Sequence, residues 1–218
     1  MIQRILPLLI GYVCGWLPTG YLVGKAHGID IREHGSGNIG MTNILRTLGV
    51  KAAAITLIGD VGKSLLATFL AWLIFHNTAG TDLPIVELYG GLGAVLGHNF
   101  PLTLKLKGGK GIASTVGVMI LFAPFELPIS VAAFFVIVLT TRYVSLGSII
   151  GLLTFFVQTV IFGCLGFFGA LTTAQFAELY ILAGVIAALG IIRHHANIKR
   201  LIAGNENKIG RKKEETNG

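Results

Sequence analysis

Residues 97–111 read Gly-His-Asn-Phe-Pro-Leu-Thr-Leu-Lys-Leu-Lys-Gly-Gly-Lys-Gly, and they lie between two long apolar runs. The end of this stretch alternates three lysines with three glycines: Lys105, Lys107, Gly108, Gly109, Lys110 and Gly111. Glycine lets backbone N–H groups come close to an anion, and each lysine adds a full positive charge. The stretch therefore predicts an anion-binding turn at the end of a membrane helix. The alternative is a basic turn that only follows topology rules.

The composition is that of an integral membrane protein. The 218 residues are 53% hydrophobic and 12% charged, and the apolar residues come in runs close to membrane-spanning length. The net charge of +7 does not indicate nucleic-acid binding, because the positive residues lie between the apolar runs rather than along one face. Cys14 and Cys164 lie in apolar segments and have no disulfide or metal-ligand spacing.

The apolar runs predict an all-α membrane protein with about seven transmembrane helices. Five spans are expected over residues 5–23, 52–75, 85–104, 149–170 and 176–192. The run 112–141 carries Pro124, Glu126 and Pro128 at its middle, which favours two short helices paired as a hairpin over one long span.

The hairpin interpretation also orients the chain. It sends every one of the 17 Lys and Arg residues except Arg4 and Lys63 to one face, which the positive-inside rule makes cytoplasmic. The N-terminus is then external and the C-terminus cytoplasmic. Asp60 and Lys63, inside a predicted span, share a helical face and could neutralise each other.

A second donor-rich segment follows the first span. Its small polar and glycine residues are Ser36, Gly37, Asn38, Gly40, Thr42 and Asn43, and Arg46 follows them. A guanidinium can grip a phosphate through two N–H groups at once. We expect ligand contact here; the alternative is a connector in which Ser36 or Thr42 caps the next helix.

Two further polar segments fall on the same predicted face. One is Arg193-His194-His195-Ala196-Asn197, in which His194 and Asn197 share a helical face, and it continues to Glu206. The other holds Ser145 and Ser148, for which helix capping is the plainer interpretation. Few carboxylates accompany these donors. The balance favours an anionic ligand and argues against a metal site.

Three motifs together resemble the bacterial acyl-phosphate-dependent glycerol-3-phosphate acyltransferases, the PlsY family. They are Ser36-Gly37-Asn38-Ile39-Gly40-Met41-Thr42-Asn43-Ile44-Leu45-Arg46, then Gly97-His98-Asn99-Phe100-Pro101 with Lys107-Gly108-Gly109-Lys110-Gly111, and Arg193-His194-His195-Ala196-Asn197-Ile198-Lys199-Arg200-Leu201. The resemblance covers nearly the whole chain. Met41 departs from the alanine expected there, a change that would narrow the pocket without removing a polar group.

The resemblance implies transfer of a fatty acyl group from acyl phosphate to the 1-position of glycerol 3-phosphate, without metal or cofactor, in the bacterial cytoplasmic (inner) membrane. The partners it implies are the two substrates, membrane lipid and the enzyme that supplies acyl phosphate. The expected catalytic residues are Ser36, Arg46, Lys107, Lys110, His194 and Asn197. The expected binding residues are Gly37, Asn38, Gly40, Thr42, Asn43, His98, Asn99, Gly108, Gly109, Gly111, Ser145, Ser148 and Glu206.

We expect one membrane domain over residues 1–210 and a solvated tail over 211–218. Acyl phosphate is already activated, and no carboxylate is matched to a histidine beside Ser36, so direct attack is favoured over an acyl-enzyme. The competing function is a transporter or flippase for a small phosphorylated metabolite. It would predict corresponding broken helices in two similar halves, and the sequence has no internal repeat.

Overall fold

The computed structural model describes residues 1–210, and over this range it consists of helices and connecting turns without a β-strand. The tail expected over 211–218 lies outside the described residues. The α-helices are α1 (Ile2–Gly15), α2 (Thr19–Ala26), α3 (Met41–Leu48), α4 (Val50–Phe75), α5 (Leu83–Asn99), α6 (Ile112–Phe122), α7 (Leu127–Thr141), α8 (Val144–Cys164), α9 (Thr173–Arg193) and α10 (His195–Ile202).

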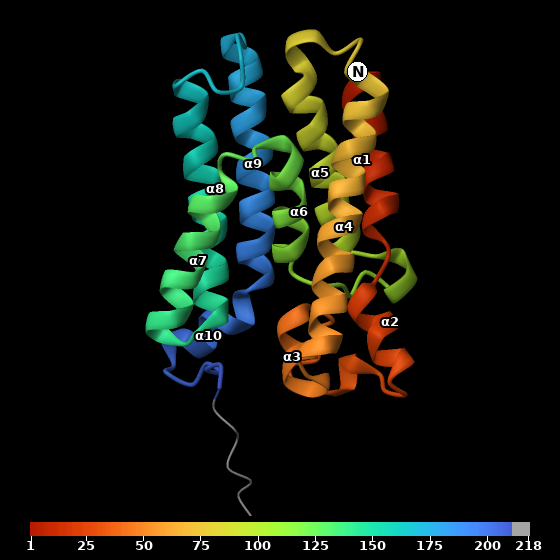
Figure 1. The fold of residues 1–218 in the computed structure, drawn as a ribbon, viewed down its shortest axis with the longest axis vertical. Coiled ribbons are helices and arrows are strands. Elements are labelled where there is room, and N and C mark those ends of the chain that lie inside the picture. Colours follow the sequence, from red (N-terminus) through yellow and green to blue (C-terminus); the bar gives the residue numbers. More distant parts are fainter. Residues whose placement is uncertain (211–218) are drawn as a thin grey trace, which may run out of the picture.

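Four helical segments are long and apolar enough to cross a membrane. They are α1 with α2 taken together, α4, α8 and α9, while α6 and α7 are shorter apolar helices. The long helices run side by side, with α3 and α10 gathered at the end opposite the N-terminus (Figure 1). The all-helical membrane architecture is thus as predicted. The count of seven spans stays a prediction.

The first span is not one continuous helix. It breaks between Gly15 and Thr19, where Pro18 has no N–H to donate and stands directly before α2. Upstream of the break, α1 lies closely against α5. A Cβ on Gly11 would lie 2.0 Å from the Gly90 carbonyl oxygen. Small residues at this contact let two apolar helices approach backbone to backbone.

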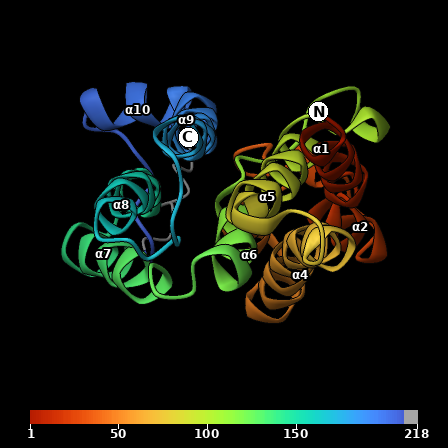
Figure 2. The ribbon, with the colours of Figure 1, turned by 90° about the horizontal axis from the view of Figure 1, so that it is seen from above.

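The run 112–141 divides into α6 and α7, as its two prolines predict. The expected pairing of these two helices is wrong. Seen from above, they diverge from the turn between them: α6 packs against α4 and α5, and α7 packs against α8 (Figure 2). The physical reason is that α6 places Val118, Met119 and Phe122 in the buried apolar cluster shared with α5.

This divergence gives the molecule two halves. One half contains α1, α2, α4, α5 and α6, and the other contains α7, α8, α9 and α10 (Figure 2). A buried apolar cluster joins them through α5, α6, α8 and α9, with Leu88, Val118, Phe155 and Ile186 at its centre. Away from that cluster, the halves enclose the cavity described below.

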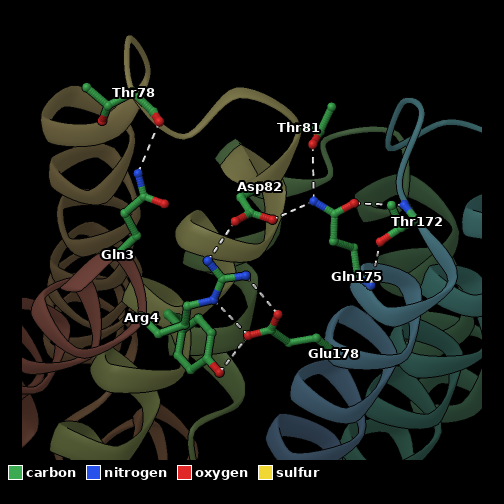
Figure 3. Close-up of polar contacts among 9 residues, drawn as sticks. Gln3, Arg4, Thr78, Thr81, Asp82, Thr172, Gln175 and Glu178 are labelled. Atoms are coloured by element: carbon green, nitrogen blue, oxygen red, sulfur yellow. Dashed lines mark hydrogen bonds and ion pairs between the residues drawn. The ribbon is translucent and has the colours of Figure 1, made fainter. Parts of the chain in front are cut away.

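A polar network ties the halves together at the end that carries the N-terminus (Figure 3). Arg4 of α1 donates to Asp82 at 2.6 Å and, through two nitrogens, to Glu178 of α9 at 3.0 Å each. Tyr89 also donates to Glu178, and Gln175 donates to Asp82 at 2.6 Å. One guanidinium therefore connects α1, the start of α5 and α9.

We expect Arg4→Ala to destabilise the protein, because it leaves the partly buried Asp82 and Glu178 without their cation. Losing hydrogen bonds to a charged group costs about 1.5–3 kcal/mol, or roughly 3–10 °C in Tm for a chain of this size. Thermal unfolding of the purified protein in detergent at a fixed scan rate measures the change. Arg32→Ala is the matched control, since its partner Asp30 is only two residues away, and it should lower Tm less. Equal shifts for the two variants would contradict the prediction.

Candidate active site

A cavity of about 340 Å³ lies between the two halves, toward the end that carries α3 and α10. One part of its wall is polar and is supplied by all the donor-rich segments that the sequence singles out. The other part is apolar and is formed by α6, α7 and α8, through Val116, Met119, Val131, Phe134 and Leu152. One cavity therefore has a cationic end and an apolar end.

The segment before α3 contributes Ser36, Asn38, Gly40, Thr42 and Asn43 to the cavity wall. Neither Ser36 nor Thr42 caps α3, so the capping alternative is wrong. Gly37 does not line the cavity; its φ of +70° lies in the left-handed region and explains the glycine.

The Asn43 side chain holds the backbone of this segment by hydrogen bonds. Its side-chain oxygen accepts from the Ser36 N–H at 2.9 Å, and its nitrogen donates to the His34 carbonyl at 3.0 Å. Asn38 makes a similar local bond, accepting from the Gly40 N–H at 2.9 Å. These two amides hold the backbone so that the Ser36 side chain lies at the cavity wall.

The expected backbone cradle at Gly108 and Gly109 is not formed. The chain after α5 turns back on the end of that helix, so the N–H groups of Gly108 and Gly109 donate to the carbonyls of Asn99 and His98 at 3.1 and 3.0 Å. Arg193 binds the carbonyls of both glycines. Their backbone groups are therefore already used by the protein, and neither residue lines the cavity.

The lysines of the same stretch separate. Lys107 is exposed and lies outside the cavity wall, and its catalytic role stays a prediction. Lys110 and Gly111 do line the cavity. The reason is the turn itself: it folds Gly108 and Gly109 back on the end of α5, leaves Lys107 exposed, and directs the chain into α6 after residue 110.

Lys110 begins a chain of charge-assisted hydrogen bonds. Its ammonium donates to the Asn197 side-chain oxygen at 2.5 Å, and the Asn197 nitrogen donates to Glu206 at 2.7 Å. Arg200 and Ser145 also donate to Glu206, at 2.6 and 3.0 Å. Glu206 thus binds residues of α8 and α10 and holds Asn197 against the lysine. Ser145 serves this network rather than capping α8, and Ser148 donates to the Val144 carbonyl.

His194 lies beside this network at the end of α9, and it is buried. Its Nδ1 is 2.7 Å from the Gly190 carbonyl, which can only accept, so Nδ1 carries the proton. Burial and the nearby Lys110 charge lower the pKa of His194 to about 4. At neutral pH the imidazole is therefore uncharged, and Nε2 is free to accept a hydrogen bond.

Burial also lowers the pKa of the Lys110 ammonium, to about 8, even though Glu206 acts to raise it. Burial acts to raise the pKa of Glu206 as well, but hydrogen bonds from Asn197, Arg200 and Ser145 hold it below the usual value. Near neutral pH the cavity thus has a cationic Lys110, an anionic Glu206 and Arg46 and Arg200 as further cations at its wall.

We expect kcat/KM to fall above about pH 8, because Lys110 loses its charge as the pH passes its lowered pKa. The kcat/KM that remains in Lys110→Arg should not fall in this alkaline range, since a guanidinium stays protonated. Initial rates between pH 6 and about pH 10 for both proteins measure the difference. The same alkaline fall in Lys110→Arg would assign the titration to another group.

The remaining predicted residues divide between the wall and the protein interior. His98 lines the cavity, whereas Asn99 is fully buried outside its wall. Two charged cavity residues were not among the predicted site residues: Asp60 on α4 and Arg200 on α10. A charged residue inside an apolar span was the available signal for Asp60. Within residues 1–210, no group of three His, Cys, Asp or Glu side chains could hold a metal ion.

Comparison with known proteins gives a consistent family. A sequence profile described as glycerol-3-phosphate acyltransferase matches residues 5–204. The glycerol-3-phosphate acyltransferase of Trichlorobacter lovleyi is 42% identical over 198 residues, covering 91% of this chain and 93% of that protein. The protein of the same name from Bacillus subtilis is 42% identical over 203 residues, covering 93% and 95%.

Solved structures agree. PlsY, described as an integral membrane glycerol 3-phosphate acyltransferase, matches in its glycerol 3-phosphate form with a TM-score of 0.82 and 33% identity, over 95% of this chain and 96% of that one. Its lysophosphatidic acid form matches with a TM-score of 0.80 and 32% identity, over 95% of each chain. Fold and relatives together define an integral membrane acyltransferase. The chain belongs to the glycerol-3-phosphate acyltransferase family represented by PlsY.

Proposed function

We propose that this protein transfers a fatty acyl group from acyl phosphate to the 1-position hydroxyl of glycerol 3-phosphate, giving lysophosphatidic acid and inorganic phosphate. The observation that carries the proposal is the continuity of the cavity, in which the polar wall around Arg46 and Lys110 meets the apolar wall of α6, α7 and α8. Both substrates bear a phosphate, and one also bears a hydrocarbon chain. The solved PlsY forms are described with glycerol 3-phosphate and with lysophosphatidic acid.

In this proposal, Arg46, Lys110 and Arg200 hold the substrate phosphates, and Ser36, Asn38 and Thr42 help to position them. Three cations around one cavity suit two phosphate-bearing ligands, and charge-assisted hydrogen bonds are the strong ones. Asn197 is held by Lys110 and Glu206, and together with His194 it orients the glycerol hydroxyl. Backbone and lysine donors stabilise the oxyanion that develops on the acyl carbonyl.

The chemistry is direct attack. The 1-hydroxyl oxygen of glycerol 3-phosphate forms a bond to the acyl carbonyl carbon, the bond from that carbon to the phosphate oxygen breaks, and the phosphate leaves with the electron pair. The hydroxyl proton passes to the departing phosphate, or to the unprotonated His194 Nε2 as a base. A covalent route would need a base beside the serine. In the described part of the chain, the Ser36 hydroxyl makes no hydrogen bond to a histidine or a carboxylate.

We also propose that the α3 and α10 end faces the cytoplasm of a bacterial inner membrane, because the positive residues concentrate there. A cysteine-free protein carrying single cysteines tests this orientation in intact cells. Ala174→Cys, at the start of α9, should react with an impermeant maleimide, and Lys199→Cys, on α10, should react only after the membrane is opened. The reverse pattern would overturn the orientation.

Purified protein in detergent tests the activity. Phosphate release from palmitoyl phosphate should require glycerol 3-phosphate, yield lysophosphatidic acid in equal amount, and not occur with acyl-CoA as the donor. Mass spectrometry after mixing with acyl phosphate alone should find no acylated Ser36. An acyl adduct discharged at the turnover rate would overturn direct attack. Transport of glycerol 3-phosphate into liposomes without acyl transfer would favour the transporter instead.

A further inference from the structure

A buried charged cluster adjoins the cavity wall inside the helical bundle. It contains Asp60 and Lys63 of α4 and His98 of α5, whose exposed fractions are 2%, 6% and 4%. Asp60 and His98 line the cavity, while Lys63 lies behind them. Buried ion pairs contribute little to stability compared with apolar packing, and charged residues inside membrane helices most often serve function. The cluster therefore needs an explanation beyond packing.

The Lys63 ammonium makes two hydrogen bonds and one ion pair. Its ammonium nitrogen lies 2.7 Å from the Leu17 carbonyl, 2.8 Å from an Asp60 carboxylate oxygen and 2.9 Å from His98 Nδ1. The Leu17 carbonyl is at the break between α1 and α2. One ammonium thus connects that break to α4 and α5, and its position is determined from three directions.

These distances determine which nitrogen of His98 carries the proton. His98 Nδ1 is 2.9 Å from Lys63 but 3.5 Å from Asp60. The first distance is that of a hydrogen bond, and the second is too long for a good one. An ammonium can only donate, so Nδ1 accepts from Lys63 and the ring proton of the neutral imidazole is on Nε2.

The Nε2 end of the ring faces the basic turn. A Cβ placed on Gly109 would lie 2.0 Å from His98 Nε2, so the imidazole occupies the space beside that glycine, next to Lys110. This contact explains Gly109 sterically, since any side chain there would displace the ring. His98 itself lines the cavity, so an Nε2–H on its ring adds a donor to the cavity wall.

We propose that Asp60 and Lys63 are positioning residues, which hold His98 in the tautomer that presents Nε2–H to a substrate phosphate. The inference rests on the proposed function and adds to it a role for the second membrane helix. Without Lys63, the nearest polar neighbour of Nδ1 is Asp60, which can only accept. The proton would move to Nδ1, and Nε2 would turn a lone pair toward the phosphate.

The first test reads the tautomer directly. In ¹⁵N spectra of histidine-labelled protein in detergent, the His98 signals are assigned by their loss in His98→Ala. We expect a protonated Nε2 in the native protein and a protonated Nδ1 in Lys63→Met. A native His98 protonated on Nδ1, or a Lys63→Met spectrum without this change, would overturn the inference. This measurement needs no catalysis, so it remains informative if the proposed function fails.

The second test is kinetic. Lys63→Met should raise KM for at least one of the two phosphate substrates about ten- to a hundredfold, the range for a lost charge-assisted hydrogen bond, with a smaller change in kcat. In the His98→Ala background the same change should have no further effect on KM. Equal effects in both backgrounds, in variants with native-like thermal unfolding, would show that Lys63 acts on the fold alone. If Lys63→Met does not fold, Asp60→Asn is read by the same spectrum: Lys63 still donates to Nδ1, so Nε2 should stay protonated, and a proton on Nδ1 would overturn the inference.

Discussion

Lys110→Ala is expected to lower kcat/KM about a hundredfold or more. Lys110 is the lysine of the basic turn that lines the cavity. Its ammonium binds Asn197 directly and is connected to Glu206 through the Asn197 side chain. A hydrogen bond to a charged group contributes about 1.5–3 kcal/mol, which is ten- to a hundredfold in rate. Removing the lysine also leaves Asn197 without one of the two partners that orient it, so the loss should reach the upper end of that range.

Lys107→Ala is the matched comparison, because Lys107 belongs to the same turn but is exposed outside the cavity. Its kcat/KM should stay within about threefold of the native value, as for an exposed charge that is screened by water and salt. Steady-state kinetics for both substrates measure the two variants. Similar losses in Lys107→Ala and Lys110→Ala would instead favour the whole turn as the anion site, as the sequence pattern alone suggests.

Arg46→Ala should have the second largest effect, a loss of about ten- to a hundredfold in kcat/KM by the same reasoning. Arg46 lines the cavity from α3, and one of its terminal nitrogens donates to the Asn207 carbonyl at 3.3 Å. That weak contact leaves the remaining donors of the guanidinium available to a phosphate. Arg46→Lys should not restore the rate, because an ammonium cannot provide two parallel donors.

Arg32→Lys is the control for a change of cation away from the site. Arg32 is exposed and bound to Asp30, and its exchange should leave kcat/KM within about twofold of the native value. Full activity in Arg46→Lys would contradict a bidentate contact. It would mean that only the positive charge at this position matters.

Much of the fold can be predicted from the sequence, because hydropathy and proline determine helix spans and helix breaks locally. The apolar run 52–75 became α4 almost residue for residue, and Pro124 and Pro128 mark the break between α6 and α7. The clustering of Ser36, Arg46, Lys110, His194 and Asn197 around one cavity was likewise expected, because each lies next to a span that ends on the same predicted face.

The sequence by itself determined a helical membrane protein with its donor-rich segments at one end, since span length, helix breaks and charge placement depend on neighbours along the chain. Tertiary structure alone decided which donors face the ligand. Gly108 and Gly109 bind the end of α5 with their own backbone, Lys107 turns outward, and Glu206 reaches Asn197. Lys63 meets His98 across 35 positions of sequence. Such contacts depend on how helices that are distant in sequence pack against one another, and local sequence patterns do not predict that packing.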